Sequence, residues 1–334
     1  MSVATEEEVD LAVVEEAHGI RDKILSELRK VIIGQQDLLD QVLTAMFAGG
    51  HLLMVGVPGL AKTLLVSTLA DTLNMGFKRI QFTPDMMPSD IIGTEVLEED
   101  QTTGHKTFVF VQGPVFTNLL LADEINRTPP KTQAALMEAM QEKQVTVGKT
   151  TYPLEEPFMV MATQNPIEQE GTYPLPEAQL DRFMFMIYVD YPSDEELKQI
   201  VKKTTAEGLG KPNAVIGGEE VLRVRHLVRQ IPISDHVLDY ITQLVVSTHI
   251  NKETAHETCK KYISWGAGPR AGQYLSLGAK SRALLRGNLQ ATVEDVRAVA
   301  HSVLRHRIVT NFTAIADGVS ADNVIDTLLK EIPE

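Results

Sequence analysis

The sequence predicts an α/β fold built around a phosphate-binding loop, followed by a mainly helical region. Three observations lead to this prediction. Residues 52–63 combine an apolar strand, a tight loop and the start of a helix. Residues 119–124 form a second apolar strand that ends in two adjacent acids. Beyond about residue 193 the chain shows helical patterns separated by short polar or Gly/Pro breaks.

Two helices are expected before the loop. Apolar residues recur near helical spacing from about Glu6 to Lys30. An apolar run follows and ends at Gly34, and a second helix from about Gln36 to Ala48 ends at a Gly-Gly pair.

The loop after the first strand has the composition of a phosphate-binding site. Backbone N–H groups of such a loop, together with the following helix N-terminus, bind anions. Lys62 can reach the β- and γ-phosphates of a nucleotide, and the Thr63 hydroxyl can bind Mg²⁺. A plain Gly/Pro turn is the alternative, and Lys-Thr at the helix start argues against it. The predicted binding residues are Gly56, Val57, Pro58, Gly59, Leu60, Ala61, Lys62, Thr63 and Leu64.

One loop position departs from the G-x-x-x-x-G-K-T pattern. The sixth residue is Ala61 where the pattern has glycine. A Cβ is accommodated there only if φ is negative, so we expect a negative φ at Ala61.

The second site motif is the strand Leu119 to Asp123 with its adjacent acid, Glu124. Carboxylates at the C-terminal end of a parallel strand face the ligand crevice of an α/β sheet. Asp123 is expected to hold Mg²⁺ through water, and Glu124 to orient and deprotonate the attacking water. A helix-capping Asp-Glu is the alternative, but the pair follows a phosphate loop by about 60 residues.

The segments around these motifs alternate between strands, hairpins and helices. Strands are expected at about 77–82, 158–163 and 183–189, hairpins at 94–112 and 144–152, and a helix at 131–142. Asn165 follows one of these strands, where a polar side chain can touch a γ-phosphate or the lytic water. An Asn-Pro pair is otherwise typical of a turn.

The C-terminal part is expected to be helical, with a loop at about 208–218. Thr292 and Asp295 form a capping box at the start of one helix. The expected helices are at about 193–207, 218–230, 234–251, 269–286, 292–307 and 320–332.

Composition excludes several classes of protein. The single Cys259 rules out an intrachain disulfide and suits a reducing cytosol, so a cytoplasmic location is expected. The acidic, polar start is not typical of a signal peptide, so none is expected, and no apolar run approaches the roughly 18 residues of a membrane span. A net charge of −14 argues against a protein that grips nucleic acid over its whole surface.

Taken together, these residues resemble one family over about residues 10 to 310. The chain is similar to the MoxR-type AAA+ ATPases of the helix-2-insert clade, in which alanine at the position of Ala61 is usual. The matching motifs are GVPGLAKT at 56–63, LLLADEINRTPPKTQAALMEAMQE at 119–142, VTVGKTTYPLEEPFMVMATQNP at 145–166, LPEAQLDRF at 175–183 and GPRA at 268–271.

The resemblance implies a particular domain organisation. Residues 1–192 are expected to form a nucleotide-binding domain with a five-stranded parallel sheet flanked by helices. Residues 193–334 are expected to form a small helical lid. Residues 82–116 correspond to the helix-2 insert, and residues 144–154 to the pre-sensor-1 hairpin.

The resemblance also implies roles for further residues. It implies a ring, usually a hexamer, with ATP between neighbouring subunits. Asn165 matches sensor 1, Arg182 the arginine finger and Arg270 sensor 2, and Ile33 and Gly34 match the segment that contacts adenine. Surface salt bridges are the alternative reading of the two arginines.

The implied function is Mg-dependent ATP hydrolysis that drives chaperone-like remodelling of protein complexes. The implied partners are a protein with a von Willebrand factor A domain and a protein client. The competing functions are a DNA-translocating motor, a magnesium-chelatase motor subunit and a nucleotide switch that does not hydrolyse ATP.

Overall fold

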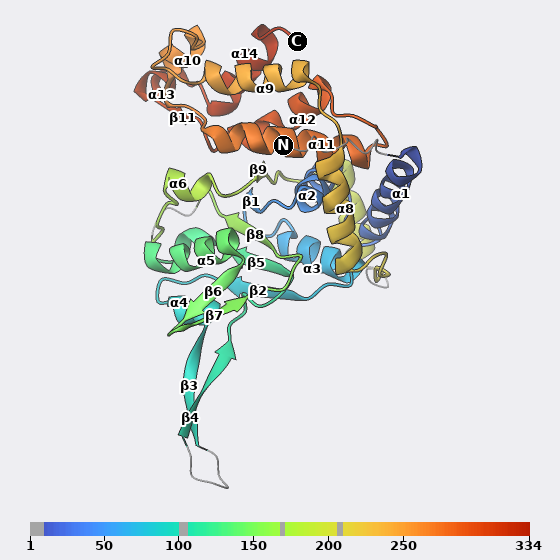
Figure 1. The fold of residues 1–334 in the computed structure, drawn as a ribbon, viewed down its shortest axis with the longest axis vertical. Helices are drawn as coiled ribbons and strands as arrows, with labels where there is room; N and C mark the ends of the chain where they lie inside the picture. The colour runs from blue at the N-terminus through green and yellow to red at the C-terminus, as the bar shows by residue number, and fades with distance from the viewer. Residues whose placement is uncertain (1–9, 100–105, 168–170, 206–209) are drawn as a thin grey trace, which may run out of the picture. The chain divides into compact units, whose positions relative to one another are not determined.

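The structure is a computed structural model that describes residues 10–99, 106–167, 171–205 and 210–334 (Figure 1). It divides into two compact units. The unit that we call the sheet unit comprises residues 27–38 and 49–219, and the helical unit comprises residues 1–26, 39–48 and 220–334. By this division residues 1–26 and 39–48 group with the C-terminal helices, and residues 193–219 group with the sheet unit. The expected domain boundary at residue 193 stays a prediction.

A five-stranded parallel sheet forms the centre of the sheet unit, as predicted. Its strand order is β2-β5-β8-β1-β9. Leu53 of β1 lies beside Ala162 of β8 on one side and Met186 of β9 on the other. The strands are β1 (Leu52–Val55), β2 (Phe77–Gln81), β5 (Leu119–Asp123), β8 (Met159–Gln164) and β9 (Phe185–Tyr188).

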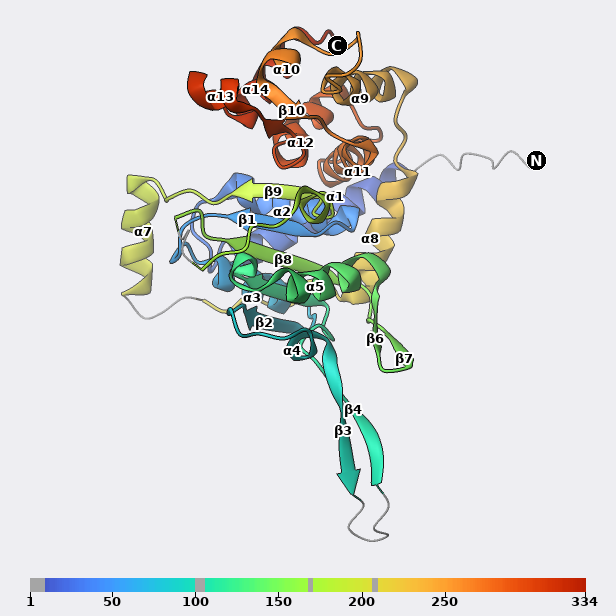
Figure 2. The ribbon, with the colours of Figure 1, turned by 90° about the vertical axis from the view of Figure 1, so that its left-hand side faces the viewer.

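Helices cover both faces of this sheet (Figure 2). Helix α5 (Pro130–Glu142) lies on one face, where its Leu136 and Met137 join Leu53, Leu120 and Val160 in the main apolar core. Helix α3 (Lys62–Thr72) packs against β2 and β5. Burial on both faces explains why the central strands are almost entirely apolar, as is usual for parallel sheets.

The two predicted antiparallel hairpins are present, and both lie on the α5 side of the sheet (Figures 1 and 2). The longer hairpin, of β3 (Gly93–Glu99) and β4 (Lys106–Gln112), follows the short helix α4 (Pro88–Ile92). The shorter one consists of β6 (Gln144–Val147) and β7 (Thr150–Pro153). Phe110 of the first hairpin stacks on Tyr152 of the second, with ring centroids 4.0 Å apart and planes at 17°.

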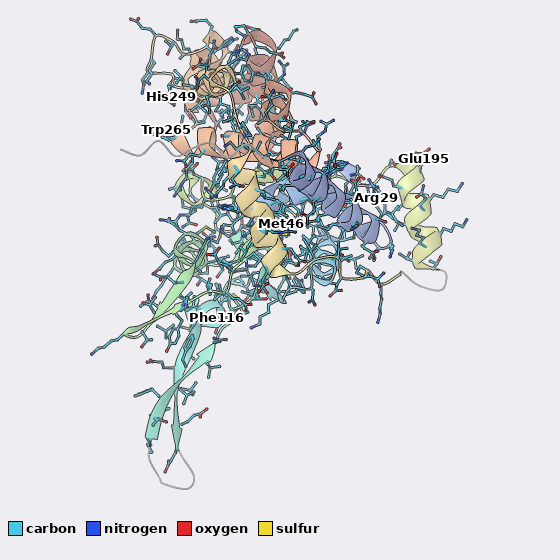
Figure 3. All side chains as sticks on the ribbon, turned by 45° about the vertical axis from the view of Figure 1, so that its right-hand side comes forward. Arg29, Met46, Phe116, Glu195, His249 and Trp265 are labelled. Carbon is cyan, nitrogen blue, oxygen red and sulfur yellow. The ribbon has the colours of Figure 1, made fainter. Side chains whose placement is uncertain are left out.

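Three short elements complete the sheet unit: η1 (Ile125–Arg127), α6 (Glu177–Leu180) and α7 (Asp194–Thr204). Helix α7 begins in a capping box formed by Ser193 and Glu196, and none of its own residues is buried. Figure 3 shows one of its side chains, Glu195, projecting from the helix.

In the core of the helical unit, α11 (Pro269–Leu285) packs against α9 (Asp235–Ser247) and α12 (Val293–Leu304). Helix α12 begins at the predicted capping box, with the Asp295 N–H donating to Thr292 Oγ1 at 3.3 Å. All six expected C-terminal helices are present, and α7 is the one that groups with the sheet unit. Besides most of α1 (Leu11–Leu28) and α2 (Gln36–Ala48), the unit contains α8 (Gly218–Gln230), α9 (Asp235–Ser247), α10 (Glu257–Tyr262), β10 (Ile263–Trp265), α11 (Pro269–Leu285), α12 (Val293–Leu304), β11 (Val309–Thr310), α13 (Phe312–Asp317) and α14 (Ala321–Glu331).

Four short elements of this unit were not expected from the sequence: α10, α13 and the antiparallel pair β10–β11. Each has six residues or fewer, too few to show a helical or strand period. Among the described residues, no helix is both long and apolar enough to cross a membrane.

Candidate nucleotide-binding site

The predicted phosphate loop connects β1 to α3 and begins in a confined place. The N–H of Val189, just after β9, donates to the carbonyl of Val55 at 2.8 Å. A Cβ on Gly56 would come within 2.6 Å of the Val189 carbonyl oxygen, so only glycine fits at the start of the loop.

Ala61 has φ 55° and ψ 23°, so the expectation of a negative φ is wrong. It is the residue that precedes α3, and its carbonyl accepts the first helical hydrogen bond, from the N–H of Leu65 at 2.9 Å. The left-handed conformation costs an L-residue roughly 1–2 kcal/mol. The turn from the loop into the helix therefore sets this conformation, and the small alanine side chain tolerates it.

Lys62 contacts the loop and lies near two acids: Asp123, the last residue of β5, and Glu124, which follows it. Its Nζ donates to the Gly56 carbonyl at 2.5 Å. Partial burial lowers the pKa of Lys62, and the negative charges of Asp123 and Glu124 act in the opposite direction. The structure thus brings together three of the residues that the sequence predicts for phosphate, metal and water.

The two acids are fixed by Thr163 of the neighbouring strand β8. The Thr163 hydroxyl donates to Asp123 Oδ1 at 2.6 Å and accepts from the backbone N–H of Glu124 at 2.9 Å. Glu124 itself has φ 57° and ψ 48°, a left-handed conformation that turns the chain sharply at the end of β5.

The Glu124 carboxylate has two side-chain donors, both on Oε2. Gln81 Nε2 donates at 2.8 Å and Arg127 donates at 2.9 Å. Asp123 Oδ2 accepts from Arg79 of β2. Four of these contacting residues were not predicted from the sequence: Thr163, Gln81, Arg79 and Arg127. Gln81 and Thr163 are nevertheless polar residues at or next to the ends of expected strands.

Asn165 follows β8 and is 7% exposed. Its Oδ1 accepts from the backbone N–H of Ile167 at 3.1 Å, which is a turn contact. The preceding Gln164 carbonyl accepts from the N–H of Gly56 at 3.1 Å, so Asn165 lies next to the start of the loop.

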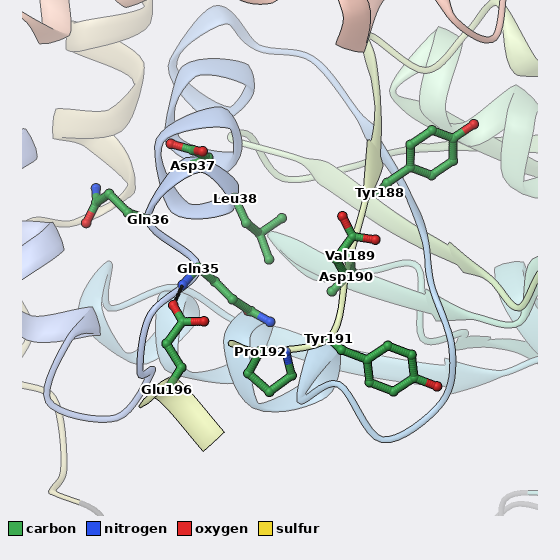
Figure 4. Close-up of a pocket in the computed structure, with 10 residues that line it drawn as sticks. All are labelled: Gln35, Gln36, Asp37, Leu38, Tyr188, Val189, Asp190, Tyr191, Pro192 and Glu196. Carbon is green, nitrogen blue, oxygen red and sulfur yellow. Dashed lines mark hydrogen bonds between the residues drawn. The ribbon is translucent and has the colours of Figure 1, made fainter. Parts of the chain in front are cut away.

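A cavity of about 370 Å³ is lined by Val189, the residue whose backbone N–H donates to Val55 just before the loop (Figure 4). Glu196 Oε1 accepts from the backbone N–H of Gln35 at 3.2 Å, and a Cβ on Gly34 would lie 1.7 Å from that oxygen. Gly34 therefore borders the cavity wall, and Ile33 precedes it in the chain. The lining residues are Gln35, Gln36, Asp37, Leu38, Tyr188, Val189, Asp190, Tyr191, Pro192 and Glu196.

The two predicted arginines occupy different units. Arg182 lies between α6 and β9 of the sheet unit and is half-buried. Arg270 is the second residue of α11 in the helical unit. Their roles stay predictions.

The donor set at the loop fits Mg²⁺. Thr63 offers a hydroxyl oxygen and Asp123 a carboxylate, and hard oxygen donors are the ligands that Mg²⁺ prefers. Mg²⁺ is usually held by one or two such side chains together with substrate phosphates and water.

Comparison with known proteins identifies the family of the chain. The model of the ATPase family associated with various cellular activities (AAA) matches residues 51–185, which contain the loop and both acids, and an AAA lid domain model matches residues 255–328. A solved structure of a provisionally assigned ATPase from Cytophaga hutchinsonii superposes with a TM-score of 0.89 at 42% identity, covering 96% of this chain and 97% of that one.

Two curated relatives extend over nearly the whole chain. Chaperone MoxR1 of Mycobacterium tuberculosis is 41% identical over 319 residues, which is 95% of this chain and 82% of the relative. The uncharacterized protein YeaC of Bacillus subtilis is 36% identical over 323 residues, which is 96% of this chain and 97% of the relative. The chain therefore belongs to the MoxR family of AAA+ ATPases.

Proposed function

We propose that the protein binds Mg·ATP on residues 56–64 and hydrolyses it, with Glu124 as the general base. The observation that carries this proposal is that Lys62, which contacts the start of the loop, lies near Asp123 and Glu124. The negative charges of the two acids act to raise the pKa of the lysine, against the effect of its burial. A cation for the phosphates, a metal ligand and a base are the groups that phosphoryl transfer to water requires.

The contacts of Glu124 suit a base. Its Oε2 is held by Gln81 and Arg127, while Oε1 accepts no hydrogen bond from the described residues. The carboxylate is thus oriented through one oxygen, and the other is left to take a proton from water. Bound Mg²⁺ would neutralise charge on the phosphates, and Thr63 and Asp123 are the residues that would hold it.

The cavity beside Val189 suits the nucleoside end of the same ligand. It borders Gly34, and Val189 joins it to the start of the loop through the hydrogen bond to Val55. This arrangement supports the assignment of Ile33 and Gly34 to adenine contact.

The proposed active unit is a homo-oligomeric ring, usually a hexamer in such proteins. In it, Arg182 would act on the ATP of a neighbouring subunit, and Arg270 would act at the same interface. The chain's own loop already supplies Lys62, so a second cation from outside completes the charge clamp in the transition state.

The proposed work of this ring is remodelling of protein complexes. One relative carries the name chaperone, which supports this function over a DNA motor or a chelatase subunit. The hairpin β3–β4 is the proposed surface for a protein client, because it exposes large apolar side chains. Leu97 is 51% exposed and Phe108 is 71% exposed. A protein with a von Willebrand factor A domain is the proposed partner.

A nucleotide-binding titration tests the proposed site. Lys62→Ala should weaken binding of a fluorescent ATP analogue by at least about 30-fold, because charge-assisted hydrogen bonds to the phosphates are lost. The matched control is Lys202→Ala, which removes an exposed lysine on α7 and should bind like the wild type. Equal affinity in wild type and Lys62→Ala would refute the assignment.

A further inference from the structure

Helix α7 leaves its apolar side chains in solvent. None of its residues is buried, and Leu197 and Val201 are 49% and 53% exposed. Helices of globular proteins are normally held in place by burial of an apolar stripe. The place of α7 in the sheet unit therefore depends on polar contacts more than on packing.

The Glu196 carboxylate makes such a contact, and each of its oxygens has a different donor. Oε2 accepts from the backbone N–H of Ser193 at 2.8 Å, which belongs to the capping box of α7. Oε1 accepts from the backbone N–H of Gln35 at 3.2 Å. The hydrogen bonds from Ser193 and, to a smaller extent, from Gln35 lower the pKa of Glu196, which keeps the carboxylate charged. One side chain thus joins α7 to the segment that precedes α2.

The backbone of this segment is bent where the carboxylate meets it. Gly34 and Gln35 both have positive φ, 69° and 52°. A Cβ on Gly34 would lie 1.7 Å from Glu196 Oε1, so the carboxylate lies directly against the glycine. Gln35 is strained in this region because it carries a Cβ. Such strain persists only where surrounding contacts hold it, and it gathers at ligand sites.

The hydrogen bond from Gln35 to Glu196 connects two walls of the cavity beside Val189 (Figure 4). Gln35 and the start of α2 line one wall, and the chain from Tyr188 to Pro192 lines the other. Glu196 also lines the cavity, on the helix that continues the second wall. A cavity that is held in shape before its ligand arrives binds that ligand more tightly, because less ordering is left to the binding step.

We propose that Glu196 is a positioning residue that holds the two walls of the base cavity together, and that a nucleoside in the cavity in turn holds α7 in place. A ligand that contacts both walls favours the state in which Glu196 bonds to Gln35. By linkage, the hydrogen bond raises the affinity for the nucleoside by the factor by which the nucleoside stabilises the hydrogen bond. This inference rests on the proposed function, in which the cavity takes the adenosine end of ATP.

Two ligands separate the base cavity from the phosphate loop. Glu196→Ala should weaken binding of a slowly hydrolysed ATP analogue about tenfold in the presence of Mg²⁺, because a charge-assisted hydrogen bond that shapes the cavity is lost. Its affinity for inorganic tripolyphosphate should match the wild type, since that ligand has no base. Glu196→Gln keeps an oxygen that can accept from Gln35 and should lose no more than about threefold. Isothermal titration calorimetry measures all three.

Two variants of the same helix start are the matched controls. Glu195→Ala removes the adjacent acid of the first turn, whose side chain projects from the helix (Figure 3). Ser193→Ala removes the hydroxyl that caps α7 but keeps the backbone N–H that orients Glu196. Both should bind the ATP analogue like the wild type. A loss in Ser193→Ala as large as that in Glu196→Ala would show that Glu196 acts only as a helix cap, which overturns the proposal.

Hydrogen exchange tests the reverse direction of the coupling. The ATP analogue should slow exchange of the α7 backbone amides at least about fivefold in the wild type and in Glu195→Ala, because the filled cavity holds the helix. Tripolyphosphate should not slow it, and in Glu196→Ala the analogue should have no effect on these amides.

Either of two further results would overturn the proposal. One is equal affinity of the wild type and Glu196→Ala for the ATP analogue. The other is exchange of the α7 amides that the analogue leaves unchanged in the wild type. A wild type that binds the analogue no more tightly than tripolyphosphate would instead refute the assignment of the cavity to adenosine in the proposed function.

Discussion

At Ala61 the geometry of the loop imposes a left-handed backbone conformation, which L-residues normally avoid. The position has a φ of 55°, although its side chain carries a Cβ. Lys62, the next residue, is the first of α3. The chain must therefore turn into the direction of the helix at Ala61. Alanine is the smallest L-residue that can occupy such a position, at a cost of roughly 1–2 kcal/mol.

Replacing this residue tests the strain. Ala61→Gly should leave the free energy of unfolding unchanged or raise it by up to about 1 kcal/mol, because relief of strain outweighs the entropy of glycine. Ala61→Val should lower it by about 1 kcal/mol or more, because a β-branched residue tolerates the left-handed region poorly. Urea denaturation measures both.

The matched control for this pair is Ala134→Gly, at an exposed position inside α5. Glycine there should destabilise by about 1 kcal/mol. An Ala61→Gly protein that is destabilised as much as Ala134→Gly would show that Ala61 is not strained.

The site residues predicted from the sequence stand in local patterns, whereas the site residues that were missed depend on which strands become neighbours. Lys62 and Glu124 stand in local patterns, a loop before a helix and an acid after a strand. Arg79, Gln81 and Thr163 contact the two acids because β2 and β8 flank β5. This order of strands is set by tertiary pairing. Local patterns carry no information on which parallel strands become neighbours.

The same distinction holds for whole elements. Strands of the sheet and the long helices were predicted because each has a clear apolar period and a start or stop signal. The hairpins were predicted from alternation around polar turns. What the sequence could not supply was their contact, the stacking of Phe110 on Tyr152 that joins two segments about 40 residues apart.

The β6–β7 hairpin should serve the client and not the chemistry. Shortening its tip between Thr146 and Thr151 should leave basal ATP hydrolysis of the assembled ring unchanged and abolish stimulation by a client, because polar loop tips usually carry recognition. Phosphate release with and without client measures both effects. Complete loss of basal turnover in an intact oligomer would contradict this role.

On the scale of the whole molecule, the central question is whether one chain suffices for catalysis. The sheet unit supplies the loop, both acids and their supporting residues. Arg182 lies in the same unit, between α6 and β9, within the segment that the family resemblance assigns to the arginine finger. If it acts on a neighbour, catalysis belongs to the interface between subunits.

Mixing two inactive variants tests the interface. Arg182→Ala should retain ATP binding and lose turnover by at least about 100-fold, because a finger supplied in trans contributes 10³–10⁵ in comparable systems. Arg182→Ala mixed with Lys62→Ala should recover part of the activity, since an intact ATP site can then adjoin an intact finger. Subunit exchange must first be demonstrated by labelled chains.

Two results together would disprove the trans role. Verified mixed rings would be as inactive as either variant alone. Wild-type activity per subunit would also stay constant down to concentrations at which only monomers exist.

The most direct test of the account is the fate of ATP on Glu124→Gln. Glutamine keeps the size and a hydrogen-bonding oxygen of the side chain but cannot take a proton from water, so kcat should fall by about 10²–10⁴. After incubation with Mg²⁺ and γ-labelled ATP, the variant should retain intact ATP with wild-type affinity, while the wild type releases phosphate. A Glu124→Gln protein that releases phosphate at the wild-type rate would contradict the assignment of Glu124 as the base and, with it, the proposed mechanism.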